Sequence, residues 1–169
     1  PQRINNLLHC GEHERNRRAG TENLAGIVGL GKAAEIVHRT LEQKFTHITQ
    51  LAELLRQGLL NRIEKVFDNS PPNCHERIPG IVSLVFTDVS AENLILRLDM
   101  EGICVSSGSA CASGSMEPSH VIAQLGINAE LAQSTVRFSV GHTNTVSEIE
   151  TTIEIVSRVV RQIRALKLT

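Results

Sequence analysis

The sequence predicts an α/β fold in which helices cover a small, mostly antiparallel sheet. Residues 81–86 form a short apolar run after a Pro-Gly break, which is typical of a buried strand. Residues 135–140 alternate, so one face carries Val136, Phe138 and Val140 and the other carries Thr135, Arg137 and Ser139. Segments with apolar residues at helical spacing separate these strands. With 169 residues, 41% of them hydrophobic, the chain is long enough to form one domain with a core.

The first third of the chain is predicted to be helical. Apolar residues recur at helical spacing from Glu22 to about Val37. The same period continues in a second stripe, made of Leu41, Phe45, Ile48, Leu55, Leu59 and Ile63. We therefore expect two long helices or one bent helix. Residues 69–73, which include two prolines, are predicted to be irregular.

Three further elements are predicted from local signals. Residues 90–101 favour a helix with Ser90 as its N-cap, and residues 103–105 favour a short strand that leads into the next loop. The last helix is expected to open with a capping box from Thr145 to Glu148. Its apolar face comprises Ile149, Ile153, Val156, Val160 and Ile163.

Residues 106–115 hold one cysteine, Cys111, among serines, glycines and alanines. Small neighbours neither bury a thiol nor fix its backbone, so Cys111 is a candidate mobile nucleophile. A Gly/Ser segment can equally be a linker, and a free cysteine is often a small buried apolar residue. The predicted strand before the run and the helix start at Glu117-Pro118, where His120 follows, hold the loop at both ends and favour the functional interpretation.

The composition argues against several classes of partner. The net charge is −1 and aromatic residues make up 2%, so neither a basic patch nor a stacking platform for nucleic acid is expected. No apolar run reaches the roughly 18 residues of a membrane span, and the first residues do not read as a secretion signal. We expect a cytoplasmic protein with four reduced cysteines rather than two disulfides. No C-x-x-C pair is present, and no metal site is predicted.

Four segments together resemble the C-terminal region of NifS/IscS-type cysteine desulfurases, which are class V aminotransferases of fold type I. They are residues 18–31, 99–111, 117–120 and 134–139. The resemblance covers nearly the whole chain and implies the C-terminal domain of an enzyme that depends on pyridoxal phosphate. Such an enzyme converts L-cysteine to L-alanine and a protein-bound persulfide for iron–sulfur cluster or thiocofactor assembly.

The resemblance also implies a division of the chain. Residues 1–21 would be a remnant of the large-domain active-site segment, and residues 22–169 would be the small domain with the interdomain helix. The N-terminal domain that binds pyridoxal phosphate would be absent. None of the chain's lysines, Lys32, Lys44, Lys65 and Lys167, follows a histidine as the Schiff-base lysine of the family does. We therefore expect the isolated chain to be inactive.

Three residues match functional positions of the family. The resemblance implies that Cys111 carries the persulfide and that Arg137 holds the substrate carboxylate, for which its rigid fork of donors is suited. It implies that Thr21 binds the cofactor phosphate of a partner subunit. From the pattern alone, Arg137 can also be a solvated surface residue, and Thr21 can be the N-cap of a helix that begins at Glu22.

One segment departs from the family. Where relatives have a glycine-rich run, this chain has charged residues between Cys10 and Glu14, and Asn16 replaces a usual glycine. Added Cβ atoms and charge would crowd a phosphate loop. Two hypotheses follow. The chain belongs to a desulfurase that uses L-cysteine, donates sulfur to acceptor or scaffold proteins and is a homodimer when intact, or it is a non-catalytic remnant that acts as a binding or dimerisation module.

Overall fold

The computed structural model describes residues 5–9, 11, 13–73, 76–107, 122, 124 and 126–167. The chain forms two compact units, Pro1–Leu41 and Glu42–Thr169. The first contains α1 (His13–Asn16) and the start of the helix α2 (Leu24–Arg62), and the second contains the sheet and the other helices. The domain boundary expected between residues 21 and 22 concerns a longer enzyme and stays a prediction.

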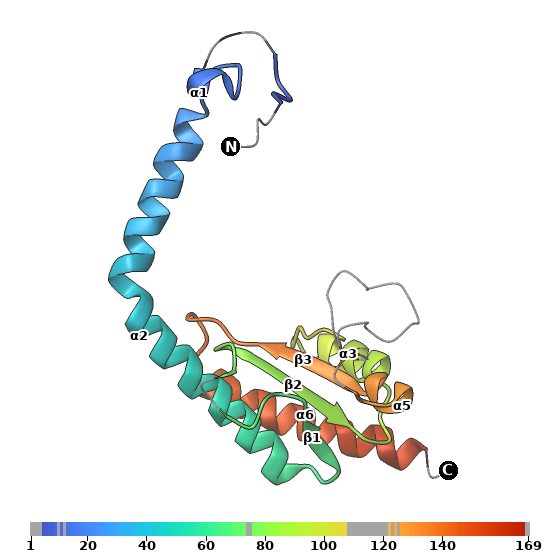
Figure 1. Ribbon diagram of the computed structural model, residues 1–169. Coiled ribbons are helices and arrows are strands. Elements are labelled where there is room, and N and C mark those ends of the chain that lie inside the picture. The colour runs from blue at the N-terminus through green and yellow to red at the C-terminus, as the bar shows by residue number, and fades with distance from the viewer. Residues whose placement is uncertain are drawn as a thin grey trace. The chain divides into compact units, whose positions relative to one another are not determined.

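The sheet has three antiparallel strands in the order β1-β2-β3 (Figure 1). These are β1 (Val66–Asp68), β2 (Ile81–Phe86) and β3 (Thr135–Ser139). The expected small antiparallel sheet and both predicted strands are confirmed. The sequence did not predict β1, because three residues are too few to show an alternating pattern.

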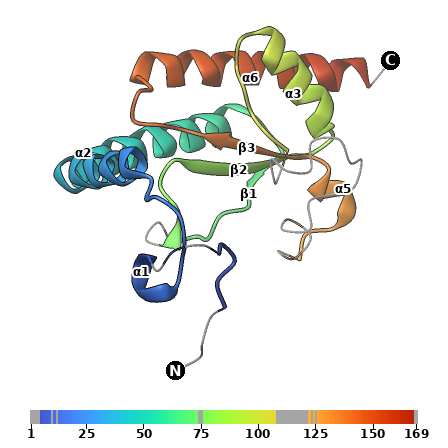
Figure 2. The same ribbon diagram turned by 90° about the horizontal axis from the view of Figure 1, so that it is seen from above.

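One face of the sheet is the floor of the hydrophobic core. The side chains of Val82, Leu84, Phe86, Val136 and Phe138 are at most 3% exposed. Figure 2 shows α3 (Ala91–Met100) and α6 (Val146–Leu166) on one side of the strands. Leucines of the second half of α2 belong to the same core cluster. Arg137 and Ser139 lie on the opposite, more open face, as the alternation predicts.

The first third of the chain is one helix rather than two, because α2 continues from Leu24 to Arg62. Its buried residues all lie in the second unit, at positions 51, 52, 55 and 59, which is the spacing of one helix face. In the first unit the glycines at positions 26, 29 and 31 weaken the helix but do not break it.

The predicted capping box at the start of α6 is confirmed. The Thr145 hydroxyl accepts a hydrogen bond from the Glu148 backbone N–H at 3.3 Å, and the Glu148 carboxylate accepts one from the Thr145 N–H at 2.8 Å. All five residues of the predicted apolar face of α6 are buried. Ser90 occupies the N-cap of α3, as predicted, but its side chain makes no capping hydrogen bond.

Two short elements complete the described fold. The helix α5 (Ala129–Ala132) has Asn128 as its N-cap and lies against β2. The strand expected at residues 103–105 does not form, because pairing with β3 occurs only at Ser106, as an isolated bridge. Residues 103–105 are therefore a connection held by packing, and Ile103 and Val105 contact the core.

Charged side chains attach the connection between β1 and β2 to α2. Arg56 donates to Glu53 at 2.6 and 2.8 Å and to Asp68 at 3.0 Å. Arg77, from the connection, lies 3.7 Å from both carboxylates and donates to the Pro71 carbonyl at 2.6 Å. The hydrogen bonds from Arg56 are the main reason why the pKa of Glu53 is lowered to about 2. This network fixes a segment that its two prolines keep irregular.

Replacing Gly58 in α2 by alanine is expected to destabilise the fold. A Cβ at this position would collide with the side chain of Ile153 on α6, which is 3% exposed, so the two helices would have to separate. Overpacking of this kind costs about 1–3 kcal/mol. The matched control is Gly31→Ala in the same helix, where a Cβ meets nothing within 4 Å and helix propensity improves. Urea unfolding should give opposite signs for the two variants, and equal effects would contradict this packing.

The Glu53 carboxylate is expected to make stability depend on pH in the acid range. Its pKa is lowered in the folded chain, so its contribution is complete above the unfolded value near 4.5 and is lost as the pH falls toward about 2. Glu53→Gln should flatten the loss of the free energy of unfolding between pH 5 and 3, roughly the window that these two values define. Glu150→Gln, at an exposed position on α6, is the control and should keep the wild-type slope.

Candidate functional site

The end of α3 directs the chain toward β3. Gly102 has a φ of +78°, and the backbone N–H groups of Gly102 and Ile103 donate to Asp99 and Leu98 at 2.9 Å each. This is the Schellman arrangement, which needs a left-handed residue after the last helical turn. Arg158 of α6 fixes the same end through two hydrogen bonds of 3.0 and 3.1 Å to Glu101. The chain therefore leaves α3 along the edge of β3.

Ser106 then pairs with Arg137. The Arg137 N–H donates to the Ser106 carbonyl at 2.7 Å, and the Ser106 N–H donates to the Arg137 carbonyl at 3.1 Å. On the other side of β3, Ser83 of β2 is the residue opposite Arg137. Arg137 thus lies between Ser83 and Ser106, at the point where the chain enters the segment that holds Cys111.

The Arg137 side chain lacks a partner for one buried donor. Its Nε is buried, and within the described residues it meets no acceptor. An unmatched buried donor costs about 1–3 kcal/mol, and an arginine remains charged at any physiological pH. A fully solvated surface arginine would not bury this atom, so Arg137 is not a residue of that kind.

Cys111 lies outside the described residues, as do Glu117 and His120. The only cysteine whose side chain is described is Cys104, which is exposed and unpaired, with its Sγ 3.9 Å from Asp99 Oδ1. The expected reduced state of the other three cysteines stays a prediction.

Thr21 is exposed and precedes α2, but it is not the N-cap. Asn23 has that role, since its carbonyl accepts from Ile27 at 2.9 Å and its Oδ1 accepts from the Gly26 N–H at 3.0 Å. The expectation that Thr21 caps a helix beginning at Glu22 is therefore wrong, because the helix begins two residues later, at Leu24. The Thr21 hydroxyl has no partner among the described residues.

The short element α1, which precedes Thr21, is a tight left-handed turn rather than a regular helix. Glu14, Arg15 and Asn16 have φ values of 52°, 56° and 63°, a region that side chains with a Cβ seldom adopt. Asn16 thus has a backbone conformation that favours glycine. Arg18 follows and donates to the carbonyls of Gly20 at 2.5 Å and Thr21 at 3.1 Å.

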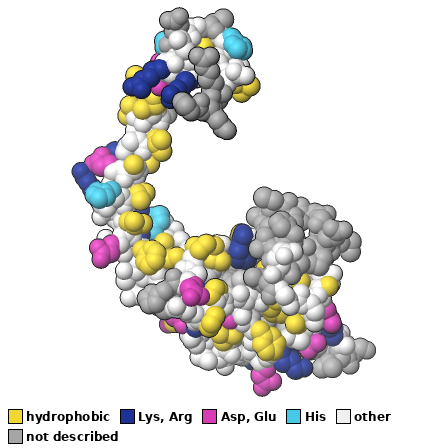
Figure 3. All heavy atoms as spheres, viewed as in Figure 1, with side chains coloured by type: hydrophobic (Ala, Val, Ile, Leu, Met, Phe, Trp, Pro, Cys, Tyr) yellow, Lys and Arg dark blue, Asp and Glu magenta, His cyan; other side chains and the backbone are white. Residues whose placement is uncertain are grey.

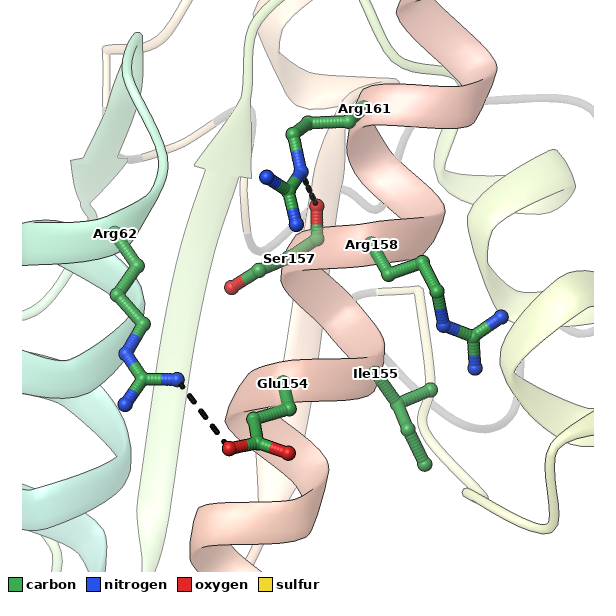
Figure 4. A pocket seen from close by; sticks show the side chains of 6 residues that line it. All are labelled: Arg62, Glu154, Ile155, Ser157, Arg158 and Arg161. Carbon is green, nitrogen blue, oxygen red and sulfur yellow. Dashed lines mark hydrogen bonds and ion pairs between the residues drawn. The ribbon is translucent and has the colours of Figure 1, made fainter.

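A surface hollow between α2 and α6 contains none of the predicted site residues (Figure 4). Three arginines line it, but Arg62 approaches Glu154 at 3.9 Å and Arg158 is paired with Glu101 outside the hollow. Arg161 donates to the Ser157 carbonyl at 3.2 Å. Most of the positive charge here is neutralised by neighbours, so the hollow is a weak candidate for an anion site.

The part of the chain that the structure describes lacks two other kinds of site. No group of three or more His, Cys, Asp or Glu side chains in it gathers closely enough to hold a metal ion. No helix within the same residues has the length and apolar character needed to cross a bilayer.

A family comparison decides the relationship. The model of the class-V aminotransferases matches residues 3–152. The chain belongs to this family. One relative is "Cysteine desulfurase IscS" of Dictyoglomus turgidum, which is 37% identical over 164 residues. A protein of the same name from Clostridium botulinum is 40% identical over 164 residues. Each alignment covers 97% of this chain and 41% of the relative, so the chain spans about two fifths of the curated proteins it matches.

Solved class V structures agree with the fold. The NifS-like protein from Rickettsia africae superposes with a TM-score of 0.75 at 30% identity, over 94% of this chain and 40% of that one. The expected architecture, a small antiparallel sheet under long helices as in the C-terminal part of such enzymes, is therefore confirmed.

The sequence did not single out Ser83 as a site residue. A serine within a buried strand carries no motif, and only the register of β2 against β3 brings it opposite Arg137. A polar residue interrupting the apolar run 81–86 was the one available signal.

Asn23→Ala is expected to lower the stability of α2 by about 1 kcal/mol. The backbone N–H of Gly26, in the first turn of this helix, loses its acceptor. Thr21→Ala should leave helix stability unchanged. Thermal unfolding followed by circular dichroism compares the two variants, and a larger loss for Thr21→Ala would restore Thr21 as the cap.

Proposed function

We propose that this chain is the C-terminal part of a cysteine desulfurase that, with pyridoxal phosphate, converts L-cysteine to L-alanine and a persulfide on Cys111. The single observation that carries the proposal is the buried, unmatched Nε of Arg137, whose backbone pairs with Ser106 on the connection that leads to the Cys111 segment. The names of the relatives support the same activity.

Arg137 is the proposed binding residue for the substrate carboxylate. A guanidinium offers two parallel N–H donors to a carboxylate, which fixes the orientation of an amino acid as well as its position. Ser106 is hydrogen-bonded to Arg137 and lies five residues before Cys111, so extended chain from Ser106 reaches at most about 18 Å. The arginine and the thiol are thus tied to one short stretch of chain.

The residues around Thr21 fit the phosphate of the cofactor. The Thr21 hydroxyl is exposed and unpaired within the described residues, and the Arg18 guanidinium is held against the carbonyls of Gly20 and Thr21. A phosphate would find there one hydroxyl donor and one cation. We propose that Thr21 contributes this contact to the partner subunit of a homodimer, and that the Schiff-base lysine lies in the remaining length of the enzyme.

Bound pyridoxal phosphate supplies an electron sink for the substrate. The Cys111 thiolate attacks the sulfur of the bound L-cysteine, and a sulfur–sulfur bond forms as the carbon–sulfur bond breaks. The electron pair goes to the substrate carbon, which takes up a proton to give L-alanine. We propose that the persulfide then passes to a sulfur-acceptor or scaffold protein for iron–sulfur cluster or thiocofactor assembly, and that the enzyme works in the cytoplasm.

One observation favours the alternative, a non-catalytic binding or dimerisation module. The part of α2 in the first unit exposes a row of large apolar side chains, seen as yellow spheres in Figure 3. They include Leu24 at 70%, Ile27 at 56%, Val28 at 63% and Leu30 at 74% exposed. Contiguous apolar surface of this kind marks an interaction site.

Desulfurase activity is tested by mixing the chain with the separately produced cofactor domain of a cysteine desulfurase relative, pyridoxal phosphate and L-cysteine. We expect release of alanine and a persulfide on Cys111, detected by mass spectrometry. Cys111→Ser should abolish both, whereas Cys104→Ser, at the other thiol near this loop, should retain them. The chain alone should give neither product.

Arg137→Lys in the same mixture should raise the KM for L-cysteine about 10- to 100-fold, because one charged hydrogen bond of the fork is lost. Absence of alanine in every mixture, with self-association in sedimentation that Leu30→Glu removes, would instead support the binding module.

A further inference from the structure

We infer that Ser83 is a substrate-positioning residue that binds, together with Arg137, the α-carboxylate of a small amino acid. The inference deepens the proposed function and rests on it. Ser83 belongs to β2, far in sequence from each of the segments that carry the resemblance to cysteine desulfurases. Its role follows from strand register alone.

The hydrogen-bond pattern of the sheet brings the two side chains close. At one end of the β2–β3 ladder the Phe86 backbone N–H donates to the Ser134 carbonyl at 2.9 Å. At the other end the Val140 N–H donates to the Gly80 carbonyl at 2.7 Å. Hydrogen-bonded and non-hydrogen-bonded pairs alternate in an antiparallel ladder, so Ser83 and Arg137 form a non-hydrogen-bonded pair. In such pairs the Cα atoms are about 4.5 Å apart and the side chains are at their closest.

The hydrogen bonds on the other side of β3 agree with Ser83 and Arg137 being a non-hydrogen-bonded pair. Arg137 exchanges both of its backbone hydrogen bonds with Ser106, so its N–H and C=O point away from Ser83. The Arg137–Ser106 pair is of the wider kind, with Cα atoms about 5.5 Å apart. Of the two serines, Ser83 is therefore the better placed to share a ligand with the guanidinium.

Both groups have unused hydrogen-bonding capacity. Within the described residues the Ser83 hydroxyl makes no hydrogen bond, and Arg137 Nε is buried without an acceptor. Ser83 and Arg137 are half-buried on the sheet face that is not the floor of the core, whereas their strand neighbours Val82 and Val136 are buried in it. A ligand on this face meets a cation and a hydroxyl together.

A carboxylate matches this pair of donors. Its two oxygens offer about four acceptor positions, of which the guanidinium fork uses two. The Ser83 hydroxyl can donate to a third, which fixes the tilt of the carboxylate above the sheet. The small serine side chain also leaves room beside the guanidinium, which a side chain larger than threonine would fill.

The test observes the Arg137 Nε–H directly. In the 169-residue chain labelled with ¹⁵N-arginine, we expect the buried Nε–H to exchange slowly with water and to give a resolved signal, which Arg137→Lys assigns by removing it. Titration with L-alanine should shift this signal, and L-alaninamide, which lacks the carboxylate, should not. Ser83→Ala should raise the dissociation constant for L-alanine about three- to tenfold, the value of one lost hydrogen bond.

Four variants make the result specific. Ser139→Ala is the same substitution on the sheet face that carries Arg137, two residue pairs along the β2–β3 ladder, and should bind like the wild type. Ser106→Ala, in the wider pair, should weaken binding less than Ser83→Ala does. Ser83→Thr and Ser83→Val are nearly isosteric and both favour strands, so tight binding by the threonine variant and weak binding by the valine variant isolates the hydroxyl.

The outcomes separate the two proposals. If L-alanine shifts the Arg137 signal and Ser83→Ala binds as tightly as Ser139→Ala, or threonine and valine at position 83 behave alike, the role of Ser83 is overturned and that of Arg137 stands. If L-alanine shifts the signal no more than L-alaninamide does, the carboxylate role of Arg137 fails, and the inference about Ser83 fails with it.

Discussion

The burial of one apolar face of β2 and β3 beneath α2 and α6 is the constraint on which the rest of the structure depends. A strand shifted by one residue would turn every core side chain to the other face, so burying Leu84 and Val136 excludes such a shift. The register also determines which polar residues meet on the open face. In the observed register Arg137 lies opposite Ser83.

The end of α3 fixes where the chain enters the segment that holds the candidate thiol. The Schellman turn at Gly102 and the Glu101–Arg158 ion pair fix where the chain leaves α3, and Ser106 joins the free edge of β3. The hydrogen bonds that Arg158 donates lower the pKa of Glu101, so this pair stays ionised further into the acid range. The backbone that leads to Cys111 is thereby anchored at Arg137.

The same helices are tied to the turns at the far end of the sheet. Arg164, in the last turn of α6, donates to the carbonyls of Glu64 at 2.8 Å and of Thr87 at 2.8 and 3.1 Å. Carbonyls in turns have no ladder partner, and a planar guanidinium can serve several of them at once. The sheet thus has a braced end at Arg164 and an open polar face at Arg137, which suits a scaffold that presents a binding group.

Sequence alone determined the elements whose patterns are local: the strands at 81–86 and 135–139, the capping box at Thr145 and the stripe of α6. It also determined the family, through strings of residues that need no contacts to be recognised. Only the tertiary structure decided that Asn23 caps α2, that β1 completes the sheet and that Ser83 stands beside Arg137. Cross-strand neighbours are distant in the chain, so no period or motif in the sequence records which of them will share a ligand.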